Sequence, residues 1–80
     1  IDLICEDRST GTILFVEVKT RAEDGRGRPM DAVDSCKQRF LRLAAQQWLM
    51  EHDAQARSAQ FDVVEVLLPK MTVNRIGNAF

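Results

Sequence analysis

Hydrophobic and polar positions in the first twenty residues alternate in a way that predicts a β-hairpin. The stretch "IDLICED" alternates weakly and leads into the turn-forming sequence "DRSTG", so we expect a strand over residues 1–6 and a turn over residues 7–11. The stretch "TILFVEVKT" predicts a second strand over residues 12–20. Its first half is apolar on both faces, which is typical of a central strand that is covered on both sides.

The next part of the chain predicts a loop followed by a long helix. Residues 21–34 place glycines and a proline among charged side chains, which favours a loop. Ser35 followed by Gln38 matches a capping box, so we expect the helix to run from residue 36 to about residue 51. The apolar positions inside that range recur with the helical period: Phe40, Leu41, Ala44, Ala45, Trp48 and Leu49.

Two further strands complete the expected fold. "FDVVEVLL", residues 61–68, and a shorter stretch over residues 71–76 both have strand character. A strand–helix–strand unit favours a right-handed crossover and parallel pairing of its two strands. We therefore expect a single α/β domain over residues 1–80, built as a mixed β-sheet with the helix of residues 35–51 packed on one face.

Composition and charge narrow the class of protein without deciding its function. The chain is 45% hydrophobic and 29% charged, as in ordinary globular domains, and its net charge of −1 gives no general case for nucleic-acid binding. Residues 19–42, however, hold seven basic and four acidic side chains, a balance of +3. Such a segment could hold a polyanion near the acidic N-terminal part, although a solvated loop and helix face would carry the same charges.

The cysteines and the first residues of the chain give information about the cellular compartment. Cys5 and Cys36 lie far apart and form no CxxC pair, and with one histidine they give no zinc-site pattern. We expect both to be buried thiols in the reducing cytoplasm. The sequence shows neither a transmembrane segment nor a signal peptide. Because the chain begins at Ile1 rather than Met, we expect an upstream segment.

The charged pair inside the second strand is the strongest indication of chemistry. Glu17 and Lys19 are two residues apart, so they share one face and lie about 6.6 Å apart along the strand. An isolated pair of this kind is most often a salt bridge at a sheet margin. Here apolar residues surround the pair, and burying an uncompensated charge costs several kcal/mol. That cost is easier to explain if a metal ion compensates it.

Asp2 supplies a second carboxylate for such a site. The hairpin can bring Asp2 beside Glu17, and two carboxylates without a cation between them repel each other. A hard divalent cation turns them into ligands, and Mg²⁺ or Mn²⁺ suits oxygen donors, waters and phosphates. Lys19 would then orient or deprotonate the attacking water, which is the arrangement of a phosphodiesterase.

Two resemblances agree with this interpretation. "ID" followed by "EVK" resembles the PD-(D/E)XK signature of restriction enzymes and archaeal Holliday-junction resolvases, with Ile1 in place of its proline. The stretches "IDLI", "FVEVKTR", "KQRFLRLAA" and "FDVVEV" are similar to the YraN-like family of bacterial proteins, over nearly the whole chain. Members of that family are typically longer at the N-terminus, where a helix carries a glutamate.

The resemblance implies a restriction endonuclease-like fold, a mixed β-sheet with a central helix packed on it, whose N-terminal helix and strand lie outside this sequence. It makes Asp2 and Glu17 metal ligands, the backbone carbonyl of Val18 a third ligand, and Lys19 the catalytic lysine. It implies a nuclease-like site rather than a specified reaction.

Several other residues are candidates for supporting contacts. Gln38 could point at the site instead of serving the capping box, and Asp62 could support Lys19 or an arginine instead of being a polar residue at a strand start. Trp48 is expected in the core, and His52 near the helix end, where the dipole favours it. Basic residues that could contact phosphates, or simply form a solvated face, are Arg21, Arg26, Arg28, Lys37, Arg39 and Arg42.

Three functions remain open at this stage. The first is a metal-dependent nuclease acting on nucleic acid, with DNA favoured. The second is a nucleic-acid-binding module without turnover, and the third is a protein-interaction domain with a vestigial site. The intact Asp2, Glu17 and Lys19 favour the first. A homodimer is compatible with the sequence, which specifies neither the substrate nor the oligomeric state.

Overall fold

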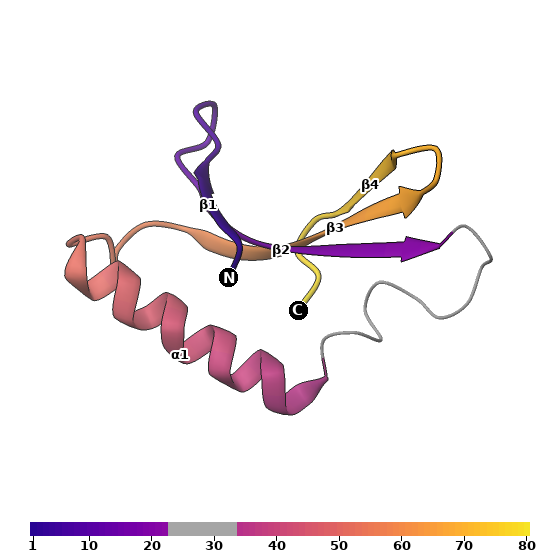
Figure 1. The fold of residues 1–80 in the computed structure, drawn as a ribbon. Coiled ribbons are helices and arrows are strands. Elements are labelled where there is room, and N and C mark those ends of the chain that lie inside the picture. Colours follow the sequence, from indigo (N-terminus) through magenta and orange to yellow (C-terminus); the bar gives the residue numbers. More distant parts are fainter. Residues whose placement is uncertain (23–33) are drawn as a thin grey trace.

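The computed structural model describes residues 1–22 and 34–80, which form a β-sheet with a long helix against it (Figure 1). The elements are β1 (Leu3–Glu6), β2 (Ile13–Ala22), α1 (Ser35–Glu51), β3 (Ala59–Leu68) and β4 (Thr72–Ile76). No helix in these residues is both long and apolar enough to cross a membrane.

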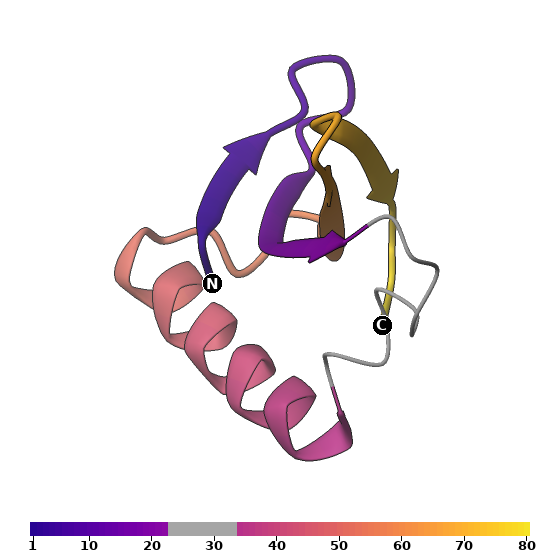
Figure 2. The ribbon, with the colours of Figure 1, turned by 45° about the vertical axis from the view of Figure 1, so that its right-hand side comes forward.

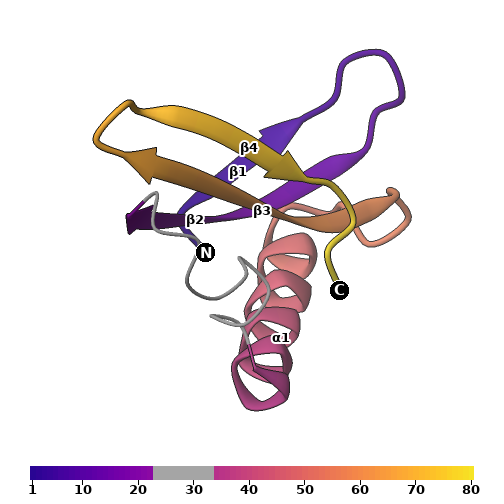
Figure 3. The ribbon, with the colours of Figure 1, turned by 90° about the vertical axis from the view of Figure 1, so that its right-hand side faces the viewer.

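The sheet is mixed, as the sequence predicts. Its strand order is β1-β2-β3-β4. β1 and β2 pair antiparallel with Leu3 opposite Val16, and β3 and β4 also pair antiparallel. β2 and β3 pair in parallel with Phe15 opposite Phe61. The parallel pairing across the helical crossover is therefore confirmed, and α1 lies on one side of the sheet in each view (Figures 2 and 3).

The core lies between α1 and the facing side of β2 and β3. Ile13 and Phe15 are buried against Ala45 of α1, and Trp48 and Leu49 pack beside them. The rings of Phe15 and Trp48 meet edge to face with centroids 5.9 Å apart, a favourable geometry for an aromatic pair. The placement of Trp48 against the core agrees with its position on the apolar stripe of the helix.

A second part of the core joins the other end of α1 to the C-terminal residues. Leu41 of α1 and Val63 of β3 are buried together, and Phe80 packs against them. Phe80 also stacks on Phe61, with ring centroids 4.8 Å apart. The chain end is thereby held on the α1 side of the sheet, where Figure 3 shows it beside β3.

The opposite face of the sheet is only partly covered within the described residues. Val16 is buried there, but Leu3 on β1 and Val73 on β4 are 54% and 61% exposed. In the described part of the chain, α1 is the one helix, and it packs on the other face. The expectation that β2 is covered on both sides is therefore not met by these residues.

The start of the helix differs from the predicted capping box. Asp34, not Ser35, is the N-cap: its side chain accepts a hydrogen bond from the Lys37 amide, 2.8 Å away. The Gln38 amide donates to the Asp34 carbonyl as an ordinary first helical bond. Asp and Ser are about equally good N-caps, so the sequence pattern alone could not choose between adjacent candidates. The helix ends at His52, which caps it and stacks on Trp48.

Two other expectations are corrected. β2 continues to Ala22, so Arg21 belongs to the strand and not to the loop. Cys5 and Cys36 are both exposed free thiols, not buried ones. Cys5 lies on the short edge strand β1, and Cys36 lies on the first turn of α1. Neither position is enclosed by the described residues.

Candidate metal and phosphate site

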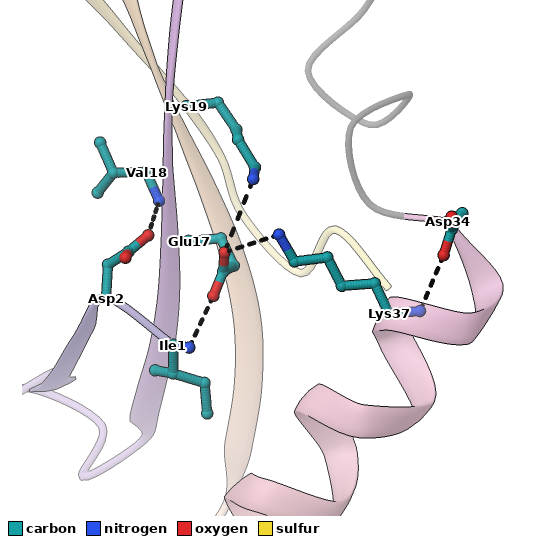
Figure 4. Close-up of polar contacts among 7 residues, drawn as sticks. All are labelled: Ile1, Asp2, Glu17, Val18, Lys19, Asp34 and Lys37. Atoms are coloured by element: carbon teal, nitrogen blue, oxygen red, sulfur yellow. Dashed lines mark hydrogen bonds and ion pairs between the residues drawn. The ribbon is translucent and has the colours of Figure 1, made fainter.

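Glu17 is the centre of the candidate site. It lies on the helix-facing side of β2, two residues beyond Phe15, and is 6% exposed. Lys37 Nζ lies 3.6 Å from its Oε2, and Lys19 Nζ lies 4.0 Å from the same oxygen (Figure 4). The buried carboxylate therefore has two lysine ammoniums beside it, one from β2 and one from α1.

Lys37 reaches this centre from α1, which the sequence interpretation did not foresee. From the sequence, Lys37 was a candidate either for a phosphate contact or for a solvated helix face. It precedes the buried residues Leu41 and Ala45 by one and two helical turns, so it shares their face. That spacing is the sequence feature from which the position of Lys37 on the buried face could have been predicted. The helix packing carries the first turn of α1 toward Glu17, as Figure 4 shows.

The two lysines differ in their affinity for protons. The Lys37 ammonium is the main reason why the pKa of Lys19 lies below its usual value, and partial burial lowers it further, against the opposing effect of the Glu17 and Asp2 carboxylates. Contact with Lys19 raises the pKa of Lys37, and the nearby carboxylates add to that rise despite some desolvation. The contact between the two amines thus lowers the pKa of Lys19 and raises that of Lys37.

Asp2 lies beside β2 at the level of Glu17. Its amide donates to the Val16 carbonyl at 2.9 Å, and its Oδ2 accepts from the Val18 amide at 2.7 Å (Figure 4). The β1–β2 register, continued by one residue, sets Asp2 opposite Glu17, and opposite residues of an antiparallel pair share a face. The influence of Asp2 on the pKa of both Lys19 and Lys37 also places its charge in this neighbourhood.

The donor set at this position suits a hard divalent ion. Mg²⁺ usually takes one or two protein carboxylates and completes its shell with waters and substrate phosphate oxygens. Asp2 and Glu17 offer two carboxylates, and the Val18 carbonyl follows directly after Glu17. Within residues 1–22 and 34–80, no group of three or more acidic, histidine or cysteine side chains could form a closed protein cage. Asp2, Glu17 and the Val18 carbonyl are therefore the groups that could hold Mg²⁺ or Mn²⁺, with waters or phosphate oxygens completing the shell.

The predicted basic residues fall into different places. Arg21 lies with its Nε 3.4 Å from Oε2 of the buried Glu65 on the neighbouring strand, so it forms an ion pair within the sheet. Arg39 and Arg42 are exposed on α1. Arg26 and Arg28 lie outside the described residues. Of the six candidates for phosphate contacts, Arg39 and Arg42 keep the role of surface cations, whereas Lys37 belongs to the site itself.

Gln38 and Asp62 are also placed by the structure. Gln38 is half-buried on the first turn of α1 and borders a surface groove with Arg39 and Arg42. The capping-box role that we favoured for it is wrong, because Asp34 is the cap.

Asp62 is 1% exposed and lies away from Lys19, on the other face of the sheet. Its Oδ2 accepts from Arg75 Nε at 2.8 Å, and its Oδ1 accepts from the Gln60 amide at 2.8 Å and the Asn78 backbone amide at 2.9 Å. Burial alone would raise the pKa of Asp62, but these hydrogen bonds and the Arg75 charge together hold that pKa below its usual value. Asp62 therefore supports an arginine and the C-terminal turn, one of the two partners that the sequence suggested.

The comparisons of this chain with known proteins agree with one another. The model of Uncharacterised protein family UPF0102 matches residues 1–66. A UPF0102 protein of Beutenbergia cavernae is 43% identical over 76 residues, which cover 95% of this chain and 63% of that protein. One of Mycolicibacterium smegmatis is 46% identical over 66 residues, covering 82% of this chain and 53% of that protein. One of Nitratidesulfovibrio vulgaris is 49% identical over 83 residues, covering 100% of this chain and 60% of that protein. The chain thus spans between 53% and 63% of the length of these relatives.

Proposed function

The chain belongs to the UPF0102 family, the YraN-like family of bacterial proteins, and on that premise we propose that it carries a metal-dependent phosphodiesterase site that acts on nucleic acid, with DNA favoured. The observation that carries this proposal is the convergence on Glu17. A buried carboxylate on β2 is approached by lysines from β2 and α1 and has Asp2 opposite it. Burying these charges costs folding free energy, whereas carboxylates and lysines placed together are the groups that a metal-dependent phosphodiesterase uses.

Charge balance supports phosphate as the ligand. The two carboxylates and the two lysine ammoniums of the site sum to zero, counting Asp2, Glu17, Lys19 and Lys37. A divalent ion would bring the site to a net positive charge, supply Lewis-acid polarisation of a phosphoryl oxygen, and so favour the extra negative charge that develops during attack on a phosphodiester.

The two lysines would then have separate roles. Lys19, whose pKa is lowered by Lys37, is the better proton acceptor and takes a proton from the attacking water. Lys37, which keeps its charge, holds a phosphate oxygen. Asp2 and Glu17 would hold the ion, and the Val18 amide fixes the orientation of Asp2 through its 2.7 Å hydrogen bond.

One observation favours a second candidate, a nucleic-acid-binding module without turnover. Lys19 and Lys37 already compensate Glu17 in the protein alone. A carboxylate with such partners can be stable without any metal. In that case the basic side chains of α1 would bind phosphates and no bond would be cleaved.

Metal titration and cleavage assays decide between the two. Isothermal titration calorimetry with Mg²⁺ and Mn²⁺ should show one site in the wild type, and labelled single-stranded, duplex and branched DNA and single-stranded RNA should be tested for cleavage in Mn²⁺. We expect Lys19→Ala to abolish cleavage and keep metal binding. Lys70→Ala, which changes an exposed lysine in the β3–β4 turn, is the matched control and should behave as wild type. Nucleic-acid binding without metal binding or cleavage would establish the second candidate instead.

A further inference from the structure

A cavity of about 260 Å³ lies between α1 and the sheet. Its apolar wall includes Phe15, Phe61 and Phe80, and its polar wall includes Arg42, Gln46 and Asn78. The C-terminal residues close one side of it, on the same side of the sheet as α1 (Figures 1 and 3). Nothing in the proposed phosphodiesterase site uses this space.

The chemistry of the walls suits a flat, uncharged ring that makes hydrogen bonds. Phe80 is stacked on Phe61 with an angle of 19° between the rings, and the Arg42 guanidinium lies 5.9 Å from the Phe80 centroid. Amide side chains such as that of Gln46 offer both donors and acceptors. Among the described residues that line the cavity, the one charged side chain is Arg42. An aromatic wall, an arginine and amides together are what nucleobase recognition uses.

The cavity is close enough to the site for one strand to occupy both. Phe15 lines the cavity and precedes Glu17 by two residues on the same face of β2. The Cα atoms of these two residues are therefore roughly 6.6 Å apart along the strand. A phosphate held at Glu17, Lys19 and Lys37 would therefore have this cavity as a near neighbour on the α1 side of the sheet.

A basic groove leads away from the cavity along α1. This hollow of about 320 Å³ is bordered by Ser35, Gln38, Arg39, Arg42, Leu43 and Gln46. It shares Arg42 and Gln46 with the cavity. Two guanidinium groups along one groove are suited to the phosphates of a single strand whose bases turn toward an aromatic wall.

We propose that this cavity receives one unpaired nucleobase, so that the strand bound at the candidate site is single-stranded or locally unpaired. The inference rests on the proposed function, because it assumes a nucleic acid at Glu17. A base inside an intact duplex could not reach the cavity without leaving the stack. The cavity thus assigns the substrate class: unpaired segments of nucleic acid are bound in preference to a continuous duplex.

An abasic scan tests this without changing the protein. Single-stranded DNA 12-mers, each lacking the base at one position but keeping every phosphate, are bound to the wild type in Ca²⁺, and affinities are measured by fluorescence anisotropy. Loss of one stacked base should weaken binding about 5- to 150-fold at one position, and much less elsewhere. The intact 12-mer should bind more tightly than the same sequence as a duplex.

Two variants locate the effect in the cavity. Phe80→Ala removes the outer ring of the wall and should weaken binding of the intact 12-mer, while abasic substitution at the sensitive position then adds little. Phe40→Ala removes a phenylalanine that is 66% exposed on α1 and does not line the cavity; it should keep the wild-type profile. Circular dichroism checks that both variants are folded.

The outcomes separate this inference from the function beneath it. A flat abasic profile in a wild type that binds the 12-mer, or tighter binding of the duplex, would overturn the base-binding cavity and leave the phosphodiesterase proposal standing. Absence of binding to every DNA and RNA tested would overturn the proposed function itself, and the cavity inference with it.

Discussion

Glu17→Gln separates the structural and the chemical roles of the buried carboxylate. The change keeps the size and polarity of the side chain and removes its charge. The sequence indicated that Asp2 and Glu17 would repel each other without a cation, in which case the loss of one charge would relieve strain. The structure instead places the ammoniums of Lys19 and Lys37 beside Glu17, so the variant leaves positive charges facing each other around a neutral amide.

The loss of stability expected for Glu17→Gln follows from the distances between the charges and from the exposure of the lysines. Two unit charges about 4 Å apart interact by roughly 4 kcal/mol at an effective dielectric constant of 20, before desolvation is subtracted. Removing one member of a buried pair typically costs about 3–5 kcal/mol. The lysine side chains are 24% exposed for Lys19 and 41% for Lys37, so both can turn toward water, and the lower end applies. We expect Glu17→Gln to lower the free energy of unfolding by about 3 kcal/mol without metal, a fall in Tm of roughly 12–24 °C.

Lys19→Ala is the companion variant. It leaves Glu17 paired with Lys37, so we expect a loss of no more than about 1 kcal/mol. Thermal melts of both variants and the wild type, with and without Mn²⁺, measure these differences. At a concentration 100 times the dissociation constant, Mn²⁺ should stabilise the wild type and Lys19→Ala by about 2.7 kcal/mol and Glu17→Gln by much less.

Two results would refute this reasoning. If Glu17→Gln melts at the wild-type temperature, the ion-pair network does not hold the site together. If Mn²⁺ raises the Tm of all three proteins equally, the ion binds somewhere other than Glu17, and the assignment of the metal site is wrong.

Three further predictions follow from other contacts. Asp2→Asn keeps an acceptor for the Val18 amide, so stability should change by no more than about 0.5 kcal/mol while calorimetric Mg²⁺ affinity falls at least about 10-fold. Asp62→Asn should lower the free energy of unfolding by about 3 kcal/mol at neutral pH. Because the pKa of Asp62 is lowered on folding, the stabilisation by its carboxylate is present above the usual aspartate pKa near 4 and is lost as the pH falls through the folded-state pKa. Denaturation curves of the variant and the wild type should therefore converge in acid. Replacing both Arg39 and Arg42 by alanine should reduce the slope of log affinity against log salt by roughly 1.4 for single-stranded DNA, and an unchanged slope would show that neither contacts phosphate.

The elements of the fold could be predicted because each has a local pattern. Alternation marks β2, the helical period marks α1, and a strand–helix–strand order leads to parallel pairing with β3. The misplaced boundaries have local causes. Asp34 and Ser35 are adjacent residues with equal capping ability. Arg21 and Ala22 stay in β2 because they pair with Leu67 and Leu68 of β3, and Arg21 also lies beside the buried Glu65 of that strand; neither partner can be read from the local pattern.

Coverage of the sheet could not be predicted from the strand pattern. Apolar residues on both faces of β2 indicate that both faces favour burial, but they do not specify what covers each face. In the described residues, α1 covers the face that carries Phe15, while Leu3 and Val73 remain exposed on the other. The exposure of Cys5 has the same origin, since it lies on the edge strand β1 at the margin of that face.

Some residues of the site could be identified from the sequence, and others could not. Glu17 and Lys19 could be identified because charges inside an apolar strand need an explanation, and Asp2 because a short turn brings it back beside them. The spacing of Lys37 from Leu41 and Ala45 indicates the buried face of the helix, but its contact with Glu17 required knowledge of how α1 crosses the sheet, which no local pattern contains. The role of Asp62 required the C-terminal turn, because two of its partners, Arg75 and Asn78, lie thirteen and sixteen residues further along the chain.

The charges around Glu17 also set a condition that any function must meet. Without a divalent ion, the carboxylates of Asp2 and Glu17 balance the ammoniums of Lys19 and Lys37, so a phosphate gains little by approaching them. The surplus positive charge of α1 then lies at its exposed arginines, and a phosphate would bind there instead. A divalent ion reverses this preference by adding two positive charges at the carboxylates. Under the proposed function, phosphate binding at Glu17 would therefore depend on the ion, and this dependence would distinguish a catalytic site from a basic helix that only binds a strand.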